Sequence, residues 1–284
     1  MTVIDQPVTQ TSELDKHYPL AEEQIRFFRE NGYIKLKQVL SAETLAHYGE
    51  EITKKVIELN TMNIPMEKRN TYQKAFLQIT NLWTKSQIVK EFVMSKRLGR
   101  IAAELMGVTG VRLYHDQALY KEPSGGITPW HADQFYWPLS NENTCTVWIP
   151  LQETPMNMGP LGFAEKSHNM EFGRDLEISD KSEQQLQDAL QQANYPLNDT
   201  PFDLGEVSYH YGWTYHRAGP NTSDTARKVM TIIYMQDGMR VINPRHNAHT
   251  NDLRSWLPGL KPGDLAESEL NPLIYKACSC AKKK

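Results

Sequence analysis

The chain is poor in cysteine, with only Cys145, Cys278 and Cys280 among its 284 residues. An odd and sparse set of thiols does not build a disulfide framework and is typical of a reducing compartment. Cys278 and Cys280 lie too far from any other Cys or His pair to predict a zinc site. The first twenty residues lack the basic and apolar regions of a secretory leader, so we expect a cytoplasmic protein.

Long apolar runs and an excess of charge of one sign are also missing. No segment approaches the roughly 18 apolar residues that a membrane-spanning helix needs. The net charge of −3 and the pI near 6.3 predict neither a basic surface for nucleic acid nor an acidic tail. We therefore expect a small-molecule partner, with no role for nucleic acid or a membrane. The sequence leaves the oligomeric state open.

The composition of the chain changes near residue 111. Before that point, hydrophobic spacing and an N-cap at Ser41 predict mainly helices. These cover residues 21–32, 41–59 and 86–105, with a strand at 33–40. Beyond it, short β-branched and aromatic runs punctuated by Pro, Gly and Asn predict antiparallel strands. The runs are 111–121, 144–152, 206–216 and 227–235, and the polar segment 173–200 predicts an insertion with one helix, 182–192.

Neither an internal repeat nor a flexible linker divides the chain. We predict a single domain over residues 19–275, preceded by a disordered segment (1–18) and followed by a flexible tail (276–284). The predicted fold class is mainly β with flanking helices. Its core is a double-stranded β-helix, the jelly roll of cupin-like proteins, and its N-terminal third is helical.

His131 and Asp133 stand two residues apart in the segment TPWHADQFYWPL. Residues i and i+2 of a strand point to the same face, so this imidazole and carboxylate can reach one point. Such a pair alone is weak evidence, because His and Asp two apart are common on surfaces. His216, in GWTYHRAGPN, is the candidate third ligand. Two imidazoles and one carboxylate on one face of an octahedral metal leave three positions open, which suits non-haem Fe(II).

Arg227 follows His216 by eleven residues and opens RKVMTIIYM, a run that predicts a buried strand. A guanidinium on a buried strand is costly unless a carboxylate meets it. The partner could be an internal acid such as Asp224, which is the simpler interpretation of the residue alone. It could also be the far carboxylate of a bound keto-diacid, held by two parallel hydrogen bonds.

Taken together, these segments resemble the phytanoyl-CoA dioxygenase family of Fe(II)- and 2-oxoglutarate-dependent oxygenases. The resemblance covers roughly residues 20–240. It is carried by EEQIRFFRENGYIKLKQVL, WHADQFYWPL, WIPLQ, MGPLGFAEKSH and GEVSYHYGWTYHRAGPNTSDTARKVMTIIYM. It implies that His131, Asp133 and His216 bind Fe(II), and that Arg227 holds the C5 carboxylate of 2-oxoglutarate. It also implies O2 as the oxidant and ascorbate as a supporting reductant.

The reaction implied by the resemblance is hydroxylation of an unactivated C–H bond of a small organic molecule, with release of succinate and CO2. Desaturation, epoxidation and cyclisation stay open. Asp133 argues against the halogenases of this fold, which lack the carboxylate ligand. The rival functions are a cupin-like metal isomerase, a small-molecule binding protein and a zinc hydrolase, none of which needs Arg227.

Two positions depart from the family pattern, which often has Gln at Ala132 and Ser at Ala218. Any contact to 2-oxoglutarate that those two side chains make elsewhere in the family is therefore lost here. Gln117 could contact cosubstrate or substrate, or lie on a solvated strand face. Trp148 could wall the cosubstrate pocket or belong to the sandwich core. We predict that Lys121, on the same strand as Gln117, is solvated.

The remaining candidates have structural alternatives. The aromatic cluster 135–137 is predicted to shape the substrate mouth or to form a hydrophobic plug. Ser167 and His168 match a turn common in the family, and we interpret them as structural. Asn221 is expected to brace the turn after His216. A second metal pair at 246–249 is disfavoured, because its two histidines lie in a Pro- and Asn-rich segment outside the predicted barrel.

Overall fold

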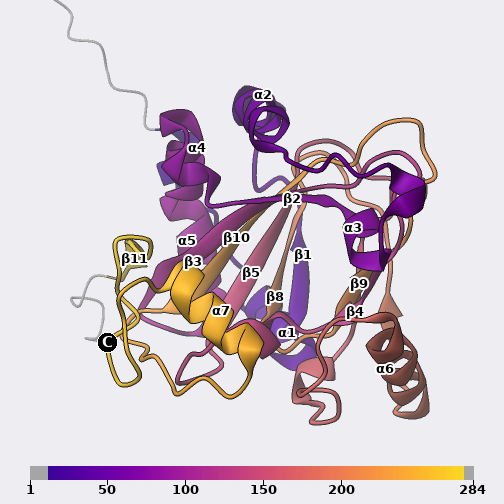
Figure 1. Cartoon of the computed structure of the whole chain (residues 1–284). Coiled ribbons are helices and arrows are strands. Elements are labelled where there is room, and N and C mark those ends of the chain that lie inside the picture. The colour runs from indigo at the N-terminus through magenta and orange to yellow at the C-terminus, as the bar shows by residue number, and fades with distance from the viewer. Residues whose placement is uncertain (1–11, 278–284) are drawn as a thin grey trace, which may run out of the picture.

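Two antiparallel sheets form the centre of the computed structural model, which describes residues 12–277 (Figure 1). The larger sheet has the strand order β1-β8-β5-β10-β3-β11, with β2 also paired to β3, and the smaller one has the order β4-β9-β6-β7. This arrangement confirms the predicted jelly roll. The strands of the larger sheet are β1 (Tyr33–Leu36), β2 (Leu77–Thr80), β3 (Gly110–Tyr120), β5 (Thr144–Pro150), β8 (Val207–Tyr211), β10 (Val229–Gln236) and β11 (Leu273–Lys276). Those of the smaller sheet are β4 (Thr128–His131), β6 (Leu161–Ala164), β7 (Leu197–Asn198) and β9 (His216–Ala218).

Helices flank both sheets, and most of them come from the N-terminal third, as predicted (Figure 1). The α-helices are α1 (Glu22–Asn31), α2 (Ala42–Leu59), α3 (Thr71–Ala75), α4 (Gln87–Val93), α5 (Lys96–Met106), α6 (Asp180–Gln192) and α7 (Asn247–Trp256). Short 3-10 helices lie at Glu13–Asp15, Met66–Lys68, Leu82–Thr84, Asp133–Tyr136, Met156–Met158 and Ser167–Asn169. None of the helices in the described residues is long and apolar enough to cross a membrane.

The two faces of the larger sheet have different surroundings, because successive side chains of a strand point to opposite faces. In β5, Cys145, Val147 and Ile149 join the main hydrophobic core, which is built with residues of α1, α2, α4 and α5. Thr146 and Trp148 point the other way and line a cavity. The alternation therefore separates the residues that stabilise the fold from those that shape a site.

Several elements differ in extent from the sequence prediction. The strand predicted at 33–40 ends at Leu36. The helical stretch 86–105 is divided at Ser95, whose hydroxyl accepts from the Leu98 backbone N–H and begins α5. The run 206–216 is divided into β8 and β9 by a turn that carries the chain from one sheet to the other. The short elements α3 and β2, together with α7 and β11, were not predicted.

The predicted disordered segment, 1–18, differs from the structure in its described part. Residues 13–15 form a 3-10 helix that buries Leu14, while residues 1–11 lie outside the described residues. The Glu13 carboxylate accepts from the Ser41 backbone N–H at 3.1 Å and lies 3.2 Å from the Arg97 guanidinium. The Ser41 N–H and the Arg97 guanidinium thus stabilise the negative charge of Glu13 at the N-terminus of α2, and they hold the segment against that helix. Of the predicted tail, 276–284, residues 278–284 lie outside the description, including Cys278 and Cys280.

Gly205 lies in the loop before β8, where this loop packs closely against the chain that follows β1. Its φ is +84°, and a Cβ there would collide with the Leu40 carbonyl oxygen. Gly259 has a φ of +77° and open space where a Cβ would lie, so it is a matched control. We expect Gly259→Ala to lose about 1–2 kcal/mol from the left-handed backbone alone. Gly205→Ala should lose more, as measured by denaturant unfolding, and equal losses would contradict the collision.

Candidate metal centre

Antiparallel pairing of β4 with β9 places His131 directly opposite His216. β4 ends at His131, and Asp133 begins the following 3-10 helix. Ala132 between them keeps an extended backbone, with φ −123° and ψ 129°. The expectation that residues 131 and 133 point to one side therefore holds, although the regular strand has ended.

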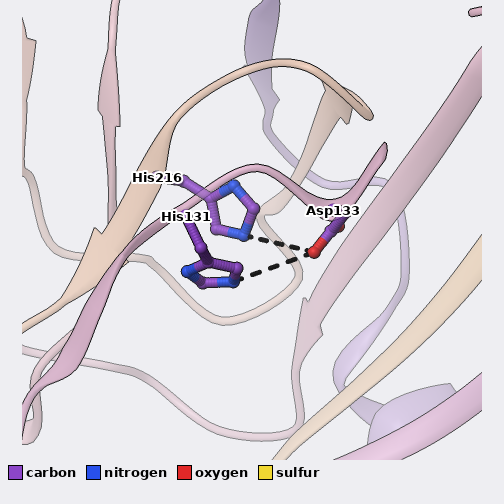
Figure 2. Close-up of side chains that lie close together, drawn as sticks. All are labelled: His131, Asp133 and His216. Atoms are coloured by element: carbon purple, nitrogen blue, oxygen red, sulfur yellow. Dashed lines mark ion pairs between the residues drawn. The ribbon is translucent and has the colours of Figure 1, made fainter. Parts of the chain in front are cut away.

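The three side chains converge on one point, as Figure 2 shows. The Nε2 atoms of His131 and His216 lie 3.8 and 3.7 Å from Asp133 Oδ1. One ligand atom from each residue lies within 4.8 Å of the other two, so the group could hold a metal ion. It is the single such group among residues 12–277, and the pair His246 and His249 has no third ligand there.

The hydrogen bonds of the two imidazoles leave their Nε2 atoms available to a metal. His131 Nδ1 lies 2.7 Å from the Pro129 carbonyl oxygen, and His216 Nδ1 lies 2.9 Å from that of Thr214. A carbonyl can only accept, so each Nδ1 carries the proton and each Nε2 offers a lone pair. Burial, and next a neighbouring histidine, lower the pKa of both imidazoles to about 4. Neutral imidazoles and a carboxylate fit a divalent iron ion.

Asp133 is oriented by two residues whose role the sequence did not reveal. Its Oδ2 accepts from the Thr146 hydroxyl at 2.9 Å and lies 3.3 Å from His210 Nε2. Oδ1 is thereby left facing the two imidazoles. Burial would raise the pKa of Asp133, but the nearby histidines, His216 foremost, outweigh it and hold the pKa below its usual range. The carboxylate is therefore ionised at neutral pH.

A cavity of about 230 Å³ opens beside the triad, between the two sheets. Arg227 lies on its wall with 2% of its surface exposed. The guanidinium stacks over Trp148, 5.4 Å from the ring centroid, and donates from Nη1 to the Gly159 carbonyl. Nε has no partner, and no carboxylate within residues 12–277 lies within 4.0 Å of the group. The internal salt bridge to Asp224 is therefore absent, and the cavity holds an unmatched buried cation.

Lys121 corrects one prediction, because it is fully buried and not solvated. Its backbone pairs with that of Arg227. The ammonium donates to the carbonyl oxygens of Gly126 and Gly219 and lies 3.3 Å from Thr128 Oγ1. Burial, and next the Arg227 charge, lower the pKa of Lys121 to about 6. Its N–H donors are all used in hydrogen bonds within the protein, so none remains for a ligand.

Gln117 and Trp148 both line the cavity. The Gln117 Oε1 atom accepts from Gln78 Nε2 at 2.5 Å, which fixes the amide against the wall. Ala218 also lines the cavity, where its methyl group makes no hydrogen bond, whereas Ala132 is buried in a separate apolar cluster.

The other predicted residues divide between the cavity and the scaffold. Tyr136 and Trp137 line the cavity, whereas Phe135 stacks on His246 at 4.3 Å between ring centroids. Ser167 is structural, as predicted, since its hydroxyl accepts from the Tyr215 backbone N–H. Asn221 braces its turn by donating to the Lys121 and Thr225 carbonyl oxygens.

Two histidines and one carboxylate at the mouth of a jelly roll define the class of non-haem iron oxygenases. The family model described as phytanoyl-CoA dioxygenase (PhyH) matches residues 28–229, and the chain belongs to this family. Enzymes of the family use Fe(II), 2-oxoglutarate and O2, and the three converging side chains match the iron they need.

Individual relatives agree with this assignment. The chain is 27% identical over 229 residues to a probable alpha-ketoglutarate-dependent hypophosphite dioxygenase of Stutzerimonas stutzeri, covering 75% of this chain and 77% of that one. Alpha-ketoglutarate is another name for 2-oxoglutarate. The non-haem alpha-ketoglutarate-dependent carbocyclase SnoK of nogalamycin biosynthesis has a TM-score of 0.72 at 26% identity, over 90% of this chain and 97% of that one. The epimerase SnoN, solved with Fe3+ and alpha-ketoglutarate, shares the fold with a TM-score of 0.75 at 22% identity, over 89% and 98% of the two chains.

The hydrogen bond from Thr146 to Asp133 predicts a specific loss of metal affinity. Thr146→Val keeps the shape of the side chain and removes the donor, so Asp133 is less well oriented. We expect Fe(II) binding, measured by anaerobic titration, to weaken about tenfold, the lower end of what partners of metal ligands contribute. Thr231→Val is the matched control, because Thr231 lines the same cavity and donates to the Gln117 carbonyl oxygen. Equal affinities of the two variants would contradict the role of Thr146.

Proposed function

We propose that the protein is an Fe(II)/2-oxoglutarate-dependent dioxygenase that hydroxylates an unactivated C–H bond of a small organic molecule, releasing succinate and CO2. The observation that supports it best is Arg227, a buried cation without an acidic partner in the cavity beside the triad. A metal isomerase, a binding protein or a zinc hydrolase would not need such a group. Asp133 favours hydroxylation over halogenation, because it fills the position that a halide would take.

In this proposal the protein positions the reactants and keeps water out. His131, Asp133 and His216 hold Fe(II), which, when bound, supplies the oxidation that couples decarboxylation of 2-oxoglutarate to attack on a C–H bond. Arg227 binds the far carboxylate of 2-oxoglutarate through the guanidinium N–H donors that have no partner within the described residues. Trp148 forms the adjoining wall, and the Gln117 amide lies within the same cavity. The sparse thiol content favours a cytoplasmic location.

The role of the triad is tested by removing its members one at a time. His131→Ala, Asp133→Ala and His216→Ala should each abolish succinate formation and sharply reduce iron content, since one of three protein ligands is lost. Circular dichroism should stay that of the wild type, because the side chains lie at a cavity and not in the main core. Wild-type iron content in all three variants would refute the assignment.

The role of Arg227 is tested by its affinity for 2-oxoglutarate. Losing one partner of a shielded charge pair costs about 2–5 kcal/mol, or about 30- to 4000-fold in affinity. We expect Arg227→Ala to raise the Km for 2-oxoglutarate at least about tenfold with iron content unchanged. Arg227→Lys should lie between, since it keeps the charge and loses the second parallel hydrogen bond.

The measurement is an anaerobic titration with 2-oxoglutarate that follows the metal-to-ligand charge-transfer band. Arg100→Ala is a suitable control, because Arg100 pairs with Glu104 on α5, away from the cavity. An unchanged midpoint in Arg227→Ala, with only thermal stability reduced, would show that Arg227 is structural and would remove the main support for 2-oxoglutarate.

A further inference from the structure

A second charged group, Asp252, lines the same cavity as Arg227. It comes from α7, which packs through Leu253 and Trp256 on an apolar cluster that includes Tyr114. The Tyr114 hydroxyl donates to Asp252 Oδ2 at 3.1 Å. No Lys, Arg or His of the described residues lies within 4.0 Å of this carboxylate, so its charge is not compensated.

The ionised carboxylate of Asp252 lowers the free energy of unfolding, because burial disfavours its charge. Burial raises the pKa of Asp252 to about 7, and the hydrogen bonds from Tyr114 and Trp256 only partly offset the rise. A partly buried carboxylate is costly without a cation, and an amide side chain would bond to Tyr114 at a lower cost. The position of Asp252 on a cavity wall suggests that the missing cation is a ligand.

The charge balance of the cavity indicates the sign of the charge that this ligand carries. Fe(II), the dianion of 2-oxoglutarate, Asp133 and Arg227 have charges that cancel, and the histidines of the triad are neutral. Arg227, Asp133 and Asp252 are the charged side chains among the groups that line the cavity. Once metal and cosubstrate are bound, Asp252 is therefore the one group facing the remaining space whose charge is uncompensated when it is ionised. With a pKa of about 7 it is partly ionised at neutral pH, and a bound cation would favour the ionised, negative form.

Aromatic rings surround that remaining space. Tyr72, Tyr136 and Trp256 line the cavity with Asp252, and they come from α3, the 3-10 helix after Ala132, and α7. The Tyr72 hydroxyl donates to Gln78 Oε1 at 2.8 Å, which directs the ring along the wall. Tyr72 is 43% exposed, so it lies where the cavity meets solvent. Aromatic faces attract cations, most strongly where water is excluded.

We propose that Asp252, with Tyr72, Tyr136 and Trp256, forms a subsite for a positively charged group, so that the substrate is a small amine or quaternary ammonium compound. The proposal rests on the proposed oxygenase function and names its substrate class. Asp252 binds the cationic end and holds a C–H bond of the same molecule toward the triad. It is a binding residue and takes no part in the oxidation.

The test compares cations with neutral compounds of the same shape. The probes are choline with 3,3-dimethylbutan-1-ol, and butylamine with butan-1-ol, each titrated calorimetrically into the anaerobic protein loaded with Fe(II) and 2-oxoglutarate. At neutral pH, the cation of at least one pair should bind at least about tenfold more tightly than its neutral partner. Equal affinities within both pairs, or no binding by either cation, would overturn the proposal. This comparison needs no variant, so it decides the matter even if a variant fails to fold.

Asp252→Asn then assigns the preference to this residue. Asparagine keeps an oxygen for the Tyr114 hydroxyl and removes the charge, so cation binding should fall at least about tenfold while the neutral compound binds within about twofold of wild type. Asp188→Asn is the matched control, since Asp188 is on α6 and outside the cavity. A cation preference that persists in Asp252→Asn would refute the subsite.

The same protein preparations are first titrated with 2-oxoglutarate alone. If they do not bind it, the proposed oxygenase function fails and not the subsite specifically. If they bind 2-oxoglutarate and show no preference for cations, the substrate class is wrong and the oxygenase function stands.

Discussion

Strand register is the constraint on which the site depends. The pairing of β4 with β9 sets His131 against His216, and the pairing of β5 with β8 sets Thr146 against His210. A slip of one residue in either pair would turn these side chains to the opposite face. The apolar residues of β5 resist such a slip, because they would then leave the main core that they form with α1, α2, α4 and α5. The packing of these helices thus fixes the geometry of a site that they do not line.

Burial then determines the chemistry of each polar group. Lys121 and Arg227 lie side by side, both buried, yet they differ in what surrounds them. Lys121 Nζ donates to backbone oxygens on the protein, and its pKa of about 6 leaves it largely uncharged at neutral pH. The guanidinium of Arg227 stacks on Trp148 and keeps donors unused, which is the basis for proposing that a ligand pairs with it. The contrast explains why Lys121 braces the wall, whereas we propose that Arg227 binds an anion.

The sequence predicted the parts of the site that depend on local spacing. An H-x-D segment, a later histidine and an arginine just before the buried strand β10 could all be found from their neighbours in the chain. Thr146 and His210 could not, because each acts through a partner across the sheet and sits in a run with ordinary strand alternation. The burial of Lys121 was missed for a similar reason: its acceptors include Gly219, which lies far along the chain. Contacts that join distant segments leave no local pattern.

The same distinction separates what this family shares from what is particular to this chain. A hydroxylase, a carbocyclase and an epimerase occur among the relatives and solved neighbours, so the fold and the triad do not determine the outcome of the reaction. The outcome must depend on which bond of the substrate lies near the metal. We propose that this choice is made by the walls formed by α3 and α7, which carry Tyr72, Asp252 and Trp256. The apolar cluster that holds α7 also contains Trp137, in the segment that begins with Asp133, and Phe135 stacks on His246 just before α7. A change in the wall that we propose to select the substrate would therefore also be felt at the metal ligand Asp133.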